Sequence, residues 1–221
     1  TLYFNANDGS NSGMWKSDGT SAGTVFVKNI THKNLINVNG TLYFSSYDRT
    51  NGQELWTSDG TSAGTMLVRD IYPGSSSSHP NELTNINGTL YFRANGGTNG
   101  HELWTSDGTS AGTVLVKDIY PGSNSSSPTF LTNINDTLYF SADEGINGKE
   151  LWKSDGTAGG TVLVKNIHPL WNSSPSALTN VNGELYFRAD DGTNGQELWK
   201  ICLIFGLVFL LIETVLLRFW K

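Results

Sequence analysis

Carboxylates recur at two fixed places in this 221-residue chain. One set precedes Leu-Trp and consists of Glu54, Glu102, Glu150 and Glu197. The other precedes Gly-Thr and consists of Asp18, Asp59, Asp107 and Asp155. Two carboxylates held about 5–10 Å apart could hydrolyse a glycosidic bond. Residues that recur once per structural unit, however, occupy equivalent places on different units. We therefore expect these acids to be structural, with the aspartates capping turns through their own side chains.

Two loops carry half of a calcium-binding pattern. Residues 143–148 and 190–195 both read D-x-G-x-N-G, which resembles the first half of a calcium loop. The third ligand position is glycine, the twelfth is Ser154 or Ile201, and the equivalent loop at Tyr47 lacks the first acid. The pattern favours a glycine-rich hairpin loop over a metal site. We predict no metal, no other cofactor and no calcium requirement for folding.

Nucleophilic catalysis has little support in the sequence. The four histidines fall at unrelated repeat positions or in links, so the repeat pairs none of them with a serine or an aspartate. They are His32, His79, His101 and His168, and we expect solvated loop side chains. The single cysteine, Cys202, excludes an intrachain disulfide and a cysteine metal site. We predict that the chain is not an enzyme and has no catalytic residues.

The overall charge excludes one class of partner. The formal net charge is −6 and the isoelectric point is near 5.1. Binding to phosphates requires a stripe of Lys and Arg, and the sequence has no such cluster. We therefore predict that the chain does not bind nucleic acid.

A repeat positions all these residues. Trp15, Trp56, Trp104, Trp152 and Trp199 recur at intervals of 41 to 48 residues, a period typical of stacked units that cannot bury their apolar faces alone. Each full unit contains four short strand patterns. In one unit, residues 83–87 lead through Asn87-Gly88, a strong hairpin signal, into residues 89–92. The third strand contains the tryptophan and the fourth is a β-branched run. We expect the recurring Tyr, Phe and Trp side chains to form the core between units.

The links between units contain all six prolines and are rich in serine. Proline cannot donate to a sheet ladder, so these segments connect the sheets. Four antiparallel strands in about 48 residues match a blade of a β-propeller. We predict an all-β fold, a β-propeller-like array of about 4–5 four-stranded blades that is incomplete, followed by a C-terminal hydrophobic helix.

The motif resembles a known family of repeats. ELWTSDGTSAGT occurs from Glu54 and Glu102, and ELWKSDGTAGGT from Glu150, each followed by a variant of LVKDI. These strings resemble the ELWxxDGT repeats of large secreted or surface proteins of bacteria. The resemblance covers residues 1–200 and implies a propeller-like fold without a defined activity. The first copy departs from the motif, with Gly13-Met14-Trp15 in place of Glu-Leu-Trp, and the fifth lacks the SDGT segment.

The strand count leaves two architectures open. The first unit lacks its first strand and the fifth lacks its fourth. Residues 178–182 could complete the first unit and close a four-bladed ring, but two strands would be left over. We favour an open arc of about five blades that is a fragment of a longer array.

The last segment has a different character. Thirteen of the seventeen residues from 201 to 217 are Leu, Ile, Val or Phe. Their summed insertion free energy outweighs the cost of Glu213, about 3 kcal/mol at the centre of a membrane helix. A membrane helix is one interpretation, a sequence artefact is the second and an amphipathic packing helix is the third. We assign residues 1–200 to the repeat domain and residues 201–221 to this tail.

The sequence predicts a non-enzymatic repeat module that binds or scaffolds an unknown protein or glycan. We expect it outside the cell or at the cell surface, with membrane contact through residues 201–217. The alternative is an accessory propeller domain of a secreted glycan-degrading enzyme.

Overall fold

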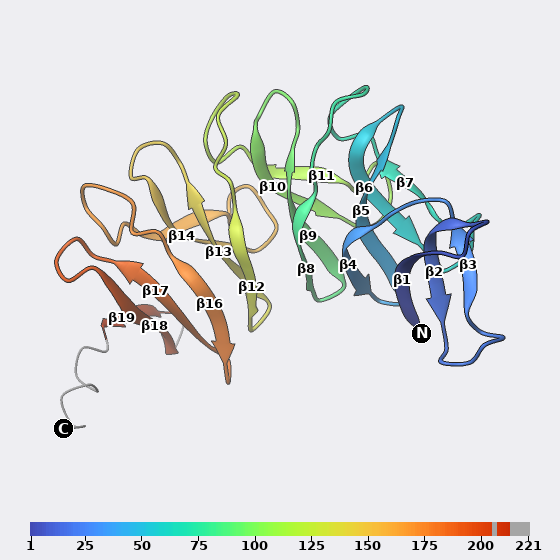
Figure 1. The fold of residues 1–221 in the computed structure, drawn as a ribbon. Coiled ribbons are helices and arrows are strands. Elements are labelled where there is room, and N and C mark those ends of the chain that lie inside the picture. The colour runs from blue at the N-terminus through green and yellow to red at the C-terminus, as the bar shows by residue number, and fades with distance from the viewer. Residues whose placement is uncertain (205–206, 213–221) are drawn as a thin grey trace.

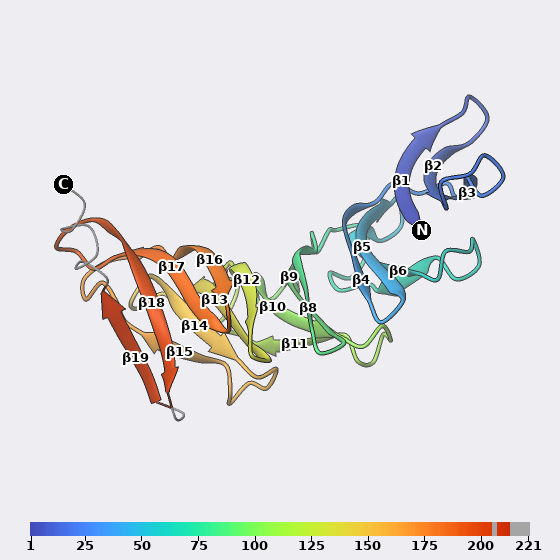
Figure 2. The same cartoon turned by 90° about the horizontal axis from the view of Figure 1, so that it is seen from below.

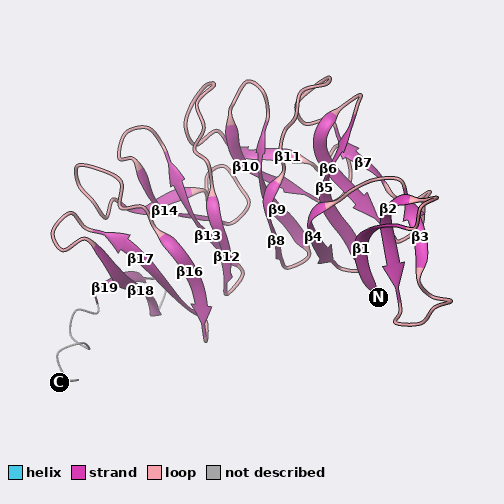
Figure 3. Cartoon of the chain, in the orientation of Figure 1, coloured by secondary structure: helices cyan, strands magenta, loops and turns pink. Residues whose placement is uncertain are grey.

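The structure is a computed structural model that describes residues 1–204 and 207–212, with side chains described as far as residue 201. Within these residues the chain forms strands and no helix (Figure 3). The strands make five antiparallel sheets, and the order of strands in each sheet follows the sequence. An all-β fold built from four-stranded antiparallel sheets, as predicted, is therefore confirmed.

Each sheet is formed by one repeat. The first contains β1 (Leu2–Asn7), β2 (Ser12–Ser17) and β3 (Val25–Lys28). The second contains β4 (Lys33–Val38), β5 (Thr41–Asp48), β6 (Gly52–Ser58) and β7 (Met66–Arg69). The third contains β8 (Asn81–Ile86), β9 (Thr89–Asn95), β10 (His101–Ser106) and β11 (Val114–Lys117). The fourth contains β12 (Thr129–Ile134), β13 (Thr137–Asp143), β14 (Lys149–Ser154) and β15 (Val162–Lys165). The fifth contains β16 (Ser176–Val181), β17 (Glu184–Asp190), β18 (Gln196–Ile204) and β19 (Leu207–Ile212).

The five sheets follow a curved, open path (Figures 1 and 2). Contacts between neighbouring sheets run along the first strands, since β4 contacts β8, β8 contacts β12 and β12 contacts β16. The first and last sheets lie at opposite ends of the array (Figure 1). β16 pairs with β17 in its own sheet and does not complete the first one. The open arc is therefore formed, and the four-bladed ring is not.

Asparagine turns join the first two strands of each full sheet. Asn87 and Gly88 have φ angles of 50° and 82°, and Asn135 and Asp136 have 47° and 67°. Two successive positive φ values are what a two-residue hairpin turn requires, and Asn, Asp and Gly adopt them at the lowest cost. The hairpins predicted from these residue pairs are confirmed.

The core lies between the sheets rather than within one. At the junction of the third and fourth sheets, Tyr91 and Leu103 from one side pack with Phe140 and Trp152 from the other. The same positions build the junctions on either side. The recurring aromatic residues are inter-sheet core, as the sequence predicts.

The predicted C-terminal helix is wrong within the described residues. β18 continues past residue 200 as far as Ile204, and β19 returns beside it, with Trp199 opposite Ile212. Ile201 is fully buried in the core between the fourth and fifth sheets. The apolar run thus completes a sheet that would otherwise have an unpaired edge, and it supplies the fourth strand that the repeat motif does not predict for this unit. The described residues contain no helix long and apolar enough to cross a membrane. Residues 205–206 and 213–217 of the predicted helix lie outside the described residues.

Candidate binding site

Three of the recurring glutamates bind the link that follows them through hydrogen bonds. Glu102 is fully buried on β10. Its Oε2 accepts hydrogen bonds from the Ile119 amide at 3.0 Å and the Ser126 hydroxyl at 2.5 Å, and its Oε1 accepts one from the Ser126 amide at 2.7 Å. Two further glutamates repeat this pattern, Glu54 with Ile71 and Ser78, and Glu150 with Ile167 and Ser173. Each carboxylate is thus enclosed by the link that follows it.

Burial changes the acidity of these glutamates. Loss of hydration raises the pKa of Glu54 and Glu102 to about 7, although hydrogen bonds from serine and backbone donors oppose the shift. The pKa of Glu150 is raised for the same reason. A raised pKa is often a sign of a catalytic acid. Glu54, Glu102 and Glu150 have no exposed surface and so cannot reach a substrate, and the structural role predicted for the recurring glutamates is confirmed for these three.

The aspartates of the Asp-Gly-Thr segments cap their own turns. Asp107 Oδ1 accepts hydrogen bonds from the Thr109 amide and the Thr109 hydroxyl, both at 2.8 Å. These bonds lower the pKa of the exposed Asp107 carboxyl, with the backbone amide as the largest cause. The other copies repeat the arrangement at Asp18, Asp59 and Asp155. Turn capping by the aspartates, as predicted, is confirmed.

The calcium-like loops use their carboxylates internally. Asp143 Oδ1 accepts a hydrogen bond from the Gly145 amide at 2.7 Å, and Asp190 Oδ1 accepts one from the Gly192 amide at 2.7 Å. Glu144 accepts a hydrogen bond from the Asn147 side chain. Across the described part of the chain, no group of three or more His, Cys, Asp or Glu side chains is placed to hold a metal ion.

The histidines are less exposed than expected. His101 lies in β10 and His32 in the first link, and burial lowers the pKa of both. The expectation of solvated loop side chains is wrong for these two, because the links pack against the sheets. His168 has a separate role. Its Nδ1 accepts hydrogen bonds from the amides of Leu170 at 3.3 Å and Trp171 at 3.0 Å.

One surface does not follow the repeat. Ile146, Leu170 and Trp171, here called the rim patch, are 86%, 81% and 72% exposed. They line a hollow of about 290 Å³. Polar groups share the lining, from Tyr120, Asp143, Asn147 and Asn172. The volume is just below the range of small-ligand sites, about 300–1,000 Å³. An exposed apolar group of this kind next to polar side chains is typical of a recognition surface.

Hydrogen bonds hold the rim patch on both sides. The two amides bound by His168 shape the turn that presents Trp171. Asn172 Oδ1 accepts a hydrogen bond from the Lys149 amide at 2.5 Å, which fixes the end of the same link to β14. On the opposite side, the bond between Asp143 and Gly145 shapes the loop that carries Ile146. The patch is therefore preorganised, which reduces the entropy lost on binding.

The repeat motif does not predict the rim patch. Its signal is a departure from the repeat, because the fourth link reads HPLWNSSPS where the third reads YPGSNSSSPT. Gly122 and Ser123 of the third link correspond to Leu170 and Trp171 of the fourth. This change lies outside the recurring motif, so the motif does not predict it.

Comparison with known proteins is limited to the fold. Neither a protein-family model nor a curated protein matches the sequence. Among solved structures, "Bacteroides ovatus Xyloglucan PUL GH43B" matches 84% of this chain and 42% of its own, with 16% identity and a TM-score of 0.42. An endo-1,4-beta-xylanase from Bacteroides thetaiotaomicron matches 95% of this chain and 89% of its own, with 14% identity and a TM-score of 0.37. An alpha-L-arabinofuranosidase from Clostridium thermocellum matches 84% and 74%, with 15% identity and a TM-score of 0.34.

The chain spans less than half the length of the first of these structures. At this overlap the likeness carries no argument about activity. The candidate site therefore depends on the geometry of the chain's own residues.

Proposed function

We propose that this chain is a non-enzymatic, propeller-like repeat module that binds a glycan through the rim patch, outside the cell or at the cell surface. The recurring residues serve as framework in this proposal, and the non-repeated residues recognise the ligand. The observation that carries it is the exposed indole of Trp171, held beside carboxylate, amide and phenol groups around one hollow.

A glycan fits this combination of groups. The faces of a pyranose ring carry C–H groups and its rim carries hydroxyls, so it complements an exposed aromatic face with polar neighbours. Asp143 and Asn147 supply oxygen lone pairs beyond those that accept hydrogen bonds from Gly145 and Asn166, and the Tyr120 hydroxyl supplies a donor or acceptor. The absence of exposed surface on Glu54, Glu102 and Glu150 supports a binding role over hydrolysis.

A protein ligand is the second candidate. Ile146 and Leu170 are more exposed than Trp171, and a cluster of three large apolar side chains around a tryptophan is typical of a hot spot in a protein interface. The resemblance to ELWxxDGT repeats of secreted or surface proteins is compatible with either ligand.

Affinity electrophoresis tests the glycan proposal. The full chain is run in native gels that contain soluble xylan, xyloglucan, arabinan or galactomannan. We expect at least one polysaccharide to retard the chain, and the Trp171→Ala variant to migrate as it does without polysaccharide. Phe130→Ala is the matched control, because Phe130 is another exposed aromatic residue, on β12, outside the rim patch.

Two results contradict this proposal. One is migration unchanged by every polysaccharide. The other is equal retardation of the parent chain and the Trp171→Ala variant, which would place the glycan elsewhere on the molecule.

A further inference from the structure

The fourth link differs from the second and third in the group that accepts a backbone amide. In the third link Asp118 Oδ2 accepts a hydrogen bond from the Gly122 amide at 3.2 Å, and the second link repeats this bond. Leu170 stands at the position of Gly122, and its amide donates to Nδ1 of His168 at 3.3 Å. The position of Asp118 is taken by Asn166, whose side-chain nitrogen donates to another loop. The link that carries the rim patch therefore has a histidine acceptor in place of a carboxylate.

His168 can form this turn only in its neutral state. Backbone amides can only donate hydrogen bonds, so Nδ1 carries no hydrogen when it accepts from Leu170 at 3.3 Å and from Trp171 at 3.0 Å. Nε2 then carries the hydrogen of the neutral ring. A ring that gains a proton is a donor at both nitrogens and can no longer accept. Protonation of His168 therefore removes the acceptor of both amides.

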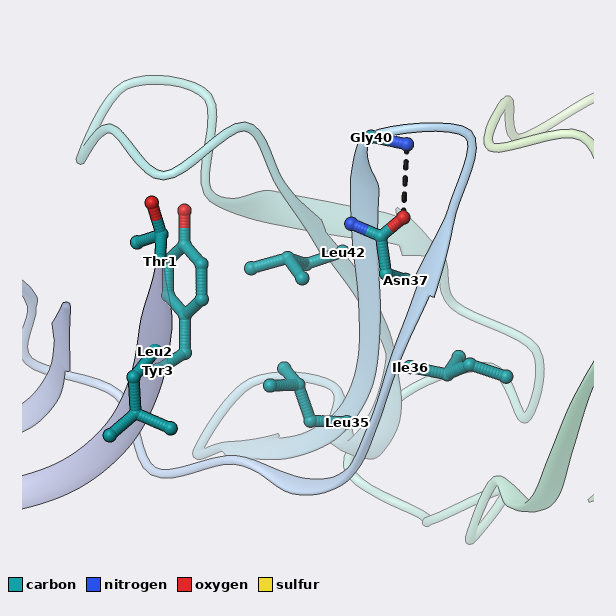
Figure 4. A pocket seen from close by; sticks show the side chains of 8 residues that line it. All are labelled: Thr1, Leu2, Tyr3, Leu35, Ile36, Asn37, Gly40 and Leu42. Atoms are coloured by element: carbon teal, nitrogen blue, oxygen red, sulfur yellow. Dashed lines mark hydrogen bonds between the residues drawn. The ribbon is translucent and has the colours of Figure 1, made fainter. Parts of the chain in front are cut away.

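Other turns of the chain use acceptors that do not change in this way. Asp48 Oδ1 accepts hydrogen bonds from the amides two and three residues further along, both at 2.7 Å, just as His168 Nδ1 does. Asn37 Oδ1 accepts one from the Gly40 amide at 3.0 Å (Figure 4). A carboxylate stays ionised down to about pH 4 and a carboxamide does not titrate, whereas the charge of histidine ordinarily changes between about pH 5 and pH 8. Of these three turns, the one at His168 is the one that mild acid can open.

The imidazole ring lies between this turn and the fifth sheet. A Cβ added at Gly192, in the loop between β17 and β18, would lie 2.7 Å from Nε2, so the ring packs against that loop. The charged groups on the surrounding elements are Asp190 and Asp191 of that loop, Asp143 and Glu144 of the loop between β13 and β14, and Lys149 and Glu150 of β14. The five acids accept hydrogen bonds from their own loops or, for Glu150, from the fourth link. In the described part of the chain none of these groups forms an ion pair with His168, so protonation would break bonds of the turn and no ion pair.

We propose that protonation of His168 weakens ligand binding at the rim patch. With the ring neutral, the turn holds Leu170 and Trp171 beside the hollow. With the ring protonated, the amides of both residues lose their acceptor and the turn opens. The ligand is therefore bound more tightly near pH 8 than near pH 5.5, through a shift between two states of one turn. The effect on binding rests on the proposed glycan function, whereas the opening of the turn does not.

Nuclear magnetic resonance of the full chain tests the turn without any ligand. At pH 8 the ring nitrogen signals of His168 should show a hydrogen on Nε2 alone. Between pH 8 and pH 5.5 the amide signals of Leu170 and Trp171 should shift along one titration curve with the ring of His168. The amide of Thr50, which Asp48 holds in the same kind of turn, should not follow this curve.

His168→Asn is the matched variant. Asparagine accepts hydrogen bonds from amides shortly after it in the chain and commonly begins a turn before proline, but it does not titrate. We expect the amide signals of Leu170 and Trp171 to be independent of pH in this variant. A change that arises instead from Glu150, whose pKa is raised by burial and which accepts the Ile167 amide of the same link, would persist in it.

Binding is then measured by tryptophan fluorescence with whichever of xylan, xyloglucan, arabinan and galactomannan retards the chain in native gels. We expect the dissociation constant of the parent chain to be roughly fivefold higher at pH 5.5 than at pH 8, as the loss of two exposed hydrogen bonds implies. The constant for His168→Asn should differ by less than about twofold between the two pH values.

Three results overturn the proposal. The first is a hydrogen on Nδ1 of His168 at pH 8. The second is an equal movement of the Leu170 and Trp171 amide signals in the parent chain and in His168→Asn. The third is equal affinity of the parent chain for the polysaccharide at both pH values. If no polysaccharide binds, the glycan proposal fails by itself, and the resonance measurement alone supports or overturns the opening of the turn.

Discussion

Glu102 accepts a hydrogen bond from the amide of Ser126, 24 residues further along the chain, at 2.7 Å. Since the two residues stand at the start and the end of the segment that leads from β10 to the next sheet, this bond fixes the length and direction of the link. Glu54 and Ser78 have the same relationship one repeat earlier. The spacing of the sheets is thus set by buried carboxylates as well as by apolar packing.

Replacement of Glu102 by alanine should destabilise the array strongly. The change leaves the amides of Ile119 and Ser126 buried without an acceptor, so we expect a loss of about 3 kcal/mol in the free energy of unfolding. Urea denaturation measures it. Glu197→Ala is the matched control, since Glu197 stands at the same repeat position but its buried Oε2 has no hydrogen-bond partner among the described residues. We expect a clearly smaller loss for the control, because removing this carboxylate leaves no buried amide of the described residues without its acceptor. Equal losses in the two variants would refute the anchoring role.

Stability should fall as the pH rises through neutrality. The folded-state pKa of Glu54 and Glu102, about 7, is above the unfolded value of about 4.3. The stabilising contribution of each protonated carboxyl is therefore fully present below the unfolded pKa and is lost as the pH rises through the folded pKa. Melting temperatures should be higher at pH 5.5 than at pH 8, and Glu102→Gln should reduce the difference. A melting temperature that rises over this interval in the parent chain would contradict the assignment.

Alanine substitutions at Gly100 and Gly122 compare two costs: a steric clash with neighbouring backbone, and an unfavourable positive φ angle. Gly100 has a φ of 64°, and a Cβ there would collide with the backbone carbonyl oxygen of Asn124 in the link. Gly122 has a φ of 89°, but a Cβ there would meet nothing within 4 Å. Gly122→Ala should cost about 1–2 kcal/mol from the backbone conformation alone. Gly100→Ala should cost clearly more, since the link must also move. The melting temperatures of the two variants measure these costs. Equal decreases would show that the link moves away from the added methyl group of Gly100→Ala at no measurable cost.

Much of this fold follows from local sequence. Asn87-Gly88 specifies a hairpin because both residues tolerate positive φ, and the alternation of the flanking residues sets which side chains are buried. The role of Glu102 could be predicted only as structural. Its partner Ser126 lies in a link whose path depends on the packing of two sheets.

The tail and the rim patch show where local sequence is insufficient. Residues 207–212 are apolar enough for a helix, and they form a strand because β18 offers a free edge, which is a tertiary property. Trp171 departs from the repeat visibly in the sequence. Its exposure depends on a turn held by His168 and could not be predicted from composition.

Calcium should have little effect on stability. Asp143 and Asp190 already accept hydrogen bonds from amides of their own loops, and glycine occupies the third ligand position. Thermal melts with EDTA and with excess calcium should coincide. A rise of several degrees in the calcium sample would show that these loops bind the ion in the folded state.

In the proposed function the framework residues recur, while recognition belongs to the rim patch. A titration of the full chain with the polysaccharide that retards it in native gels, followed by tryptophan fluorescence, separates the two roles. We predict a saturable change in the parent chain and in Phe130→Ala, and no change in Trp171→Ala, although the five repeat tryptophans remain in all three. The same saturable change in the Trp171→Ala variant would show that the polysaccharide binds outside the rim patch.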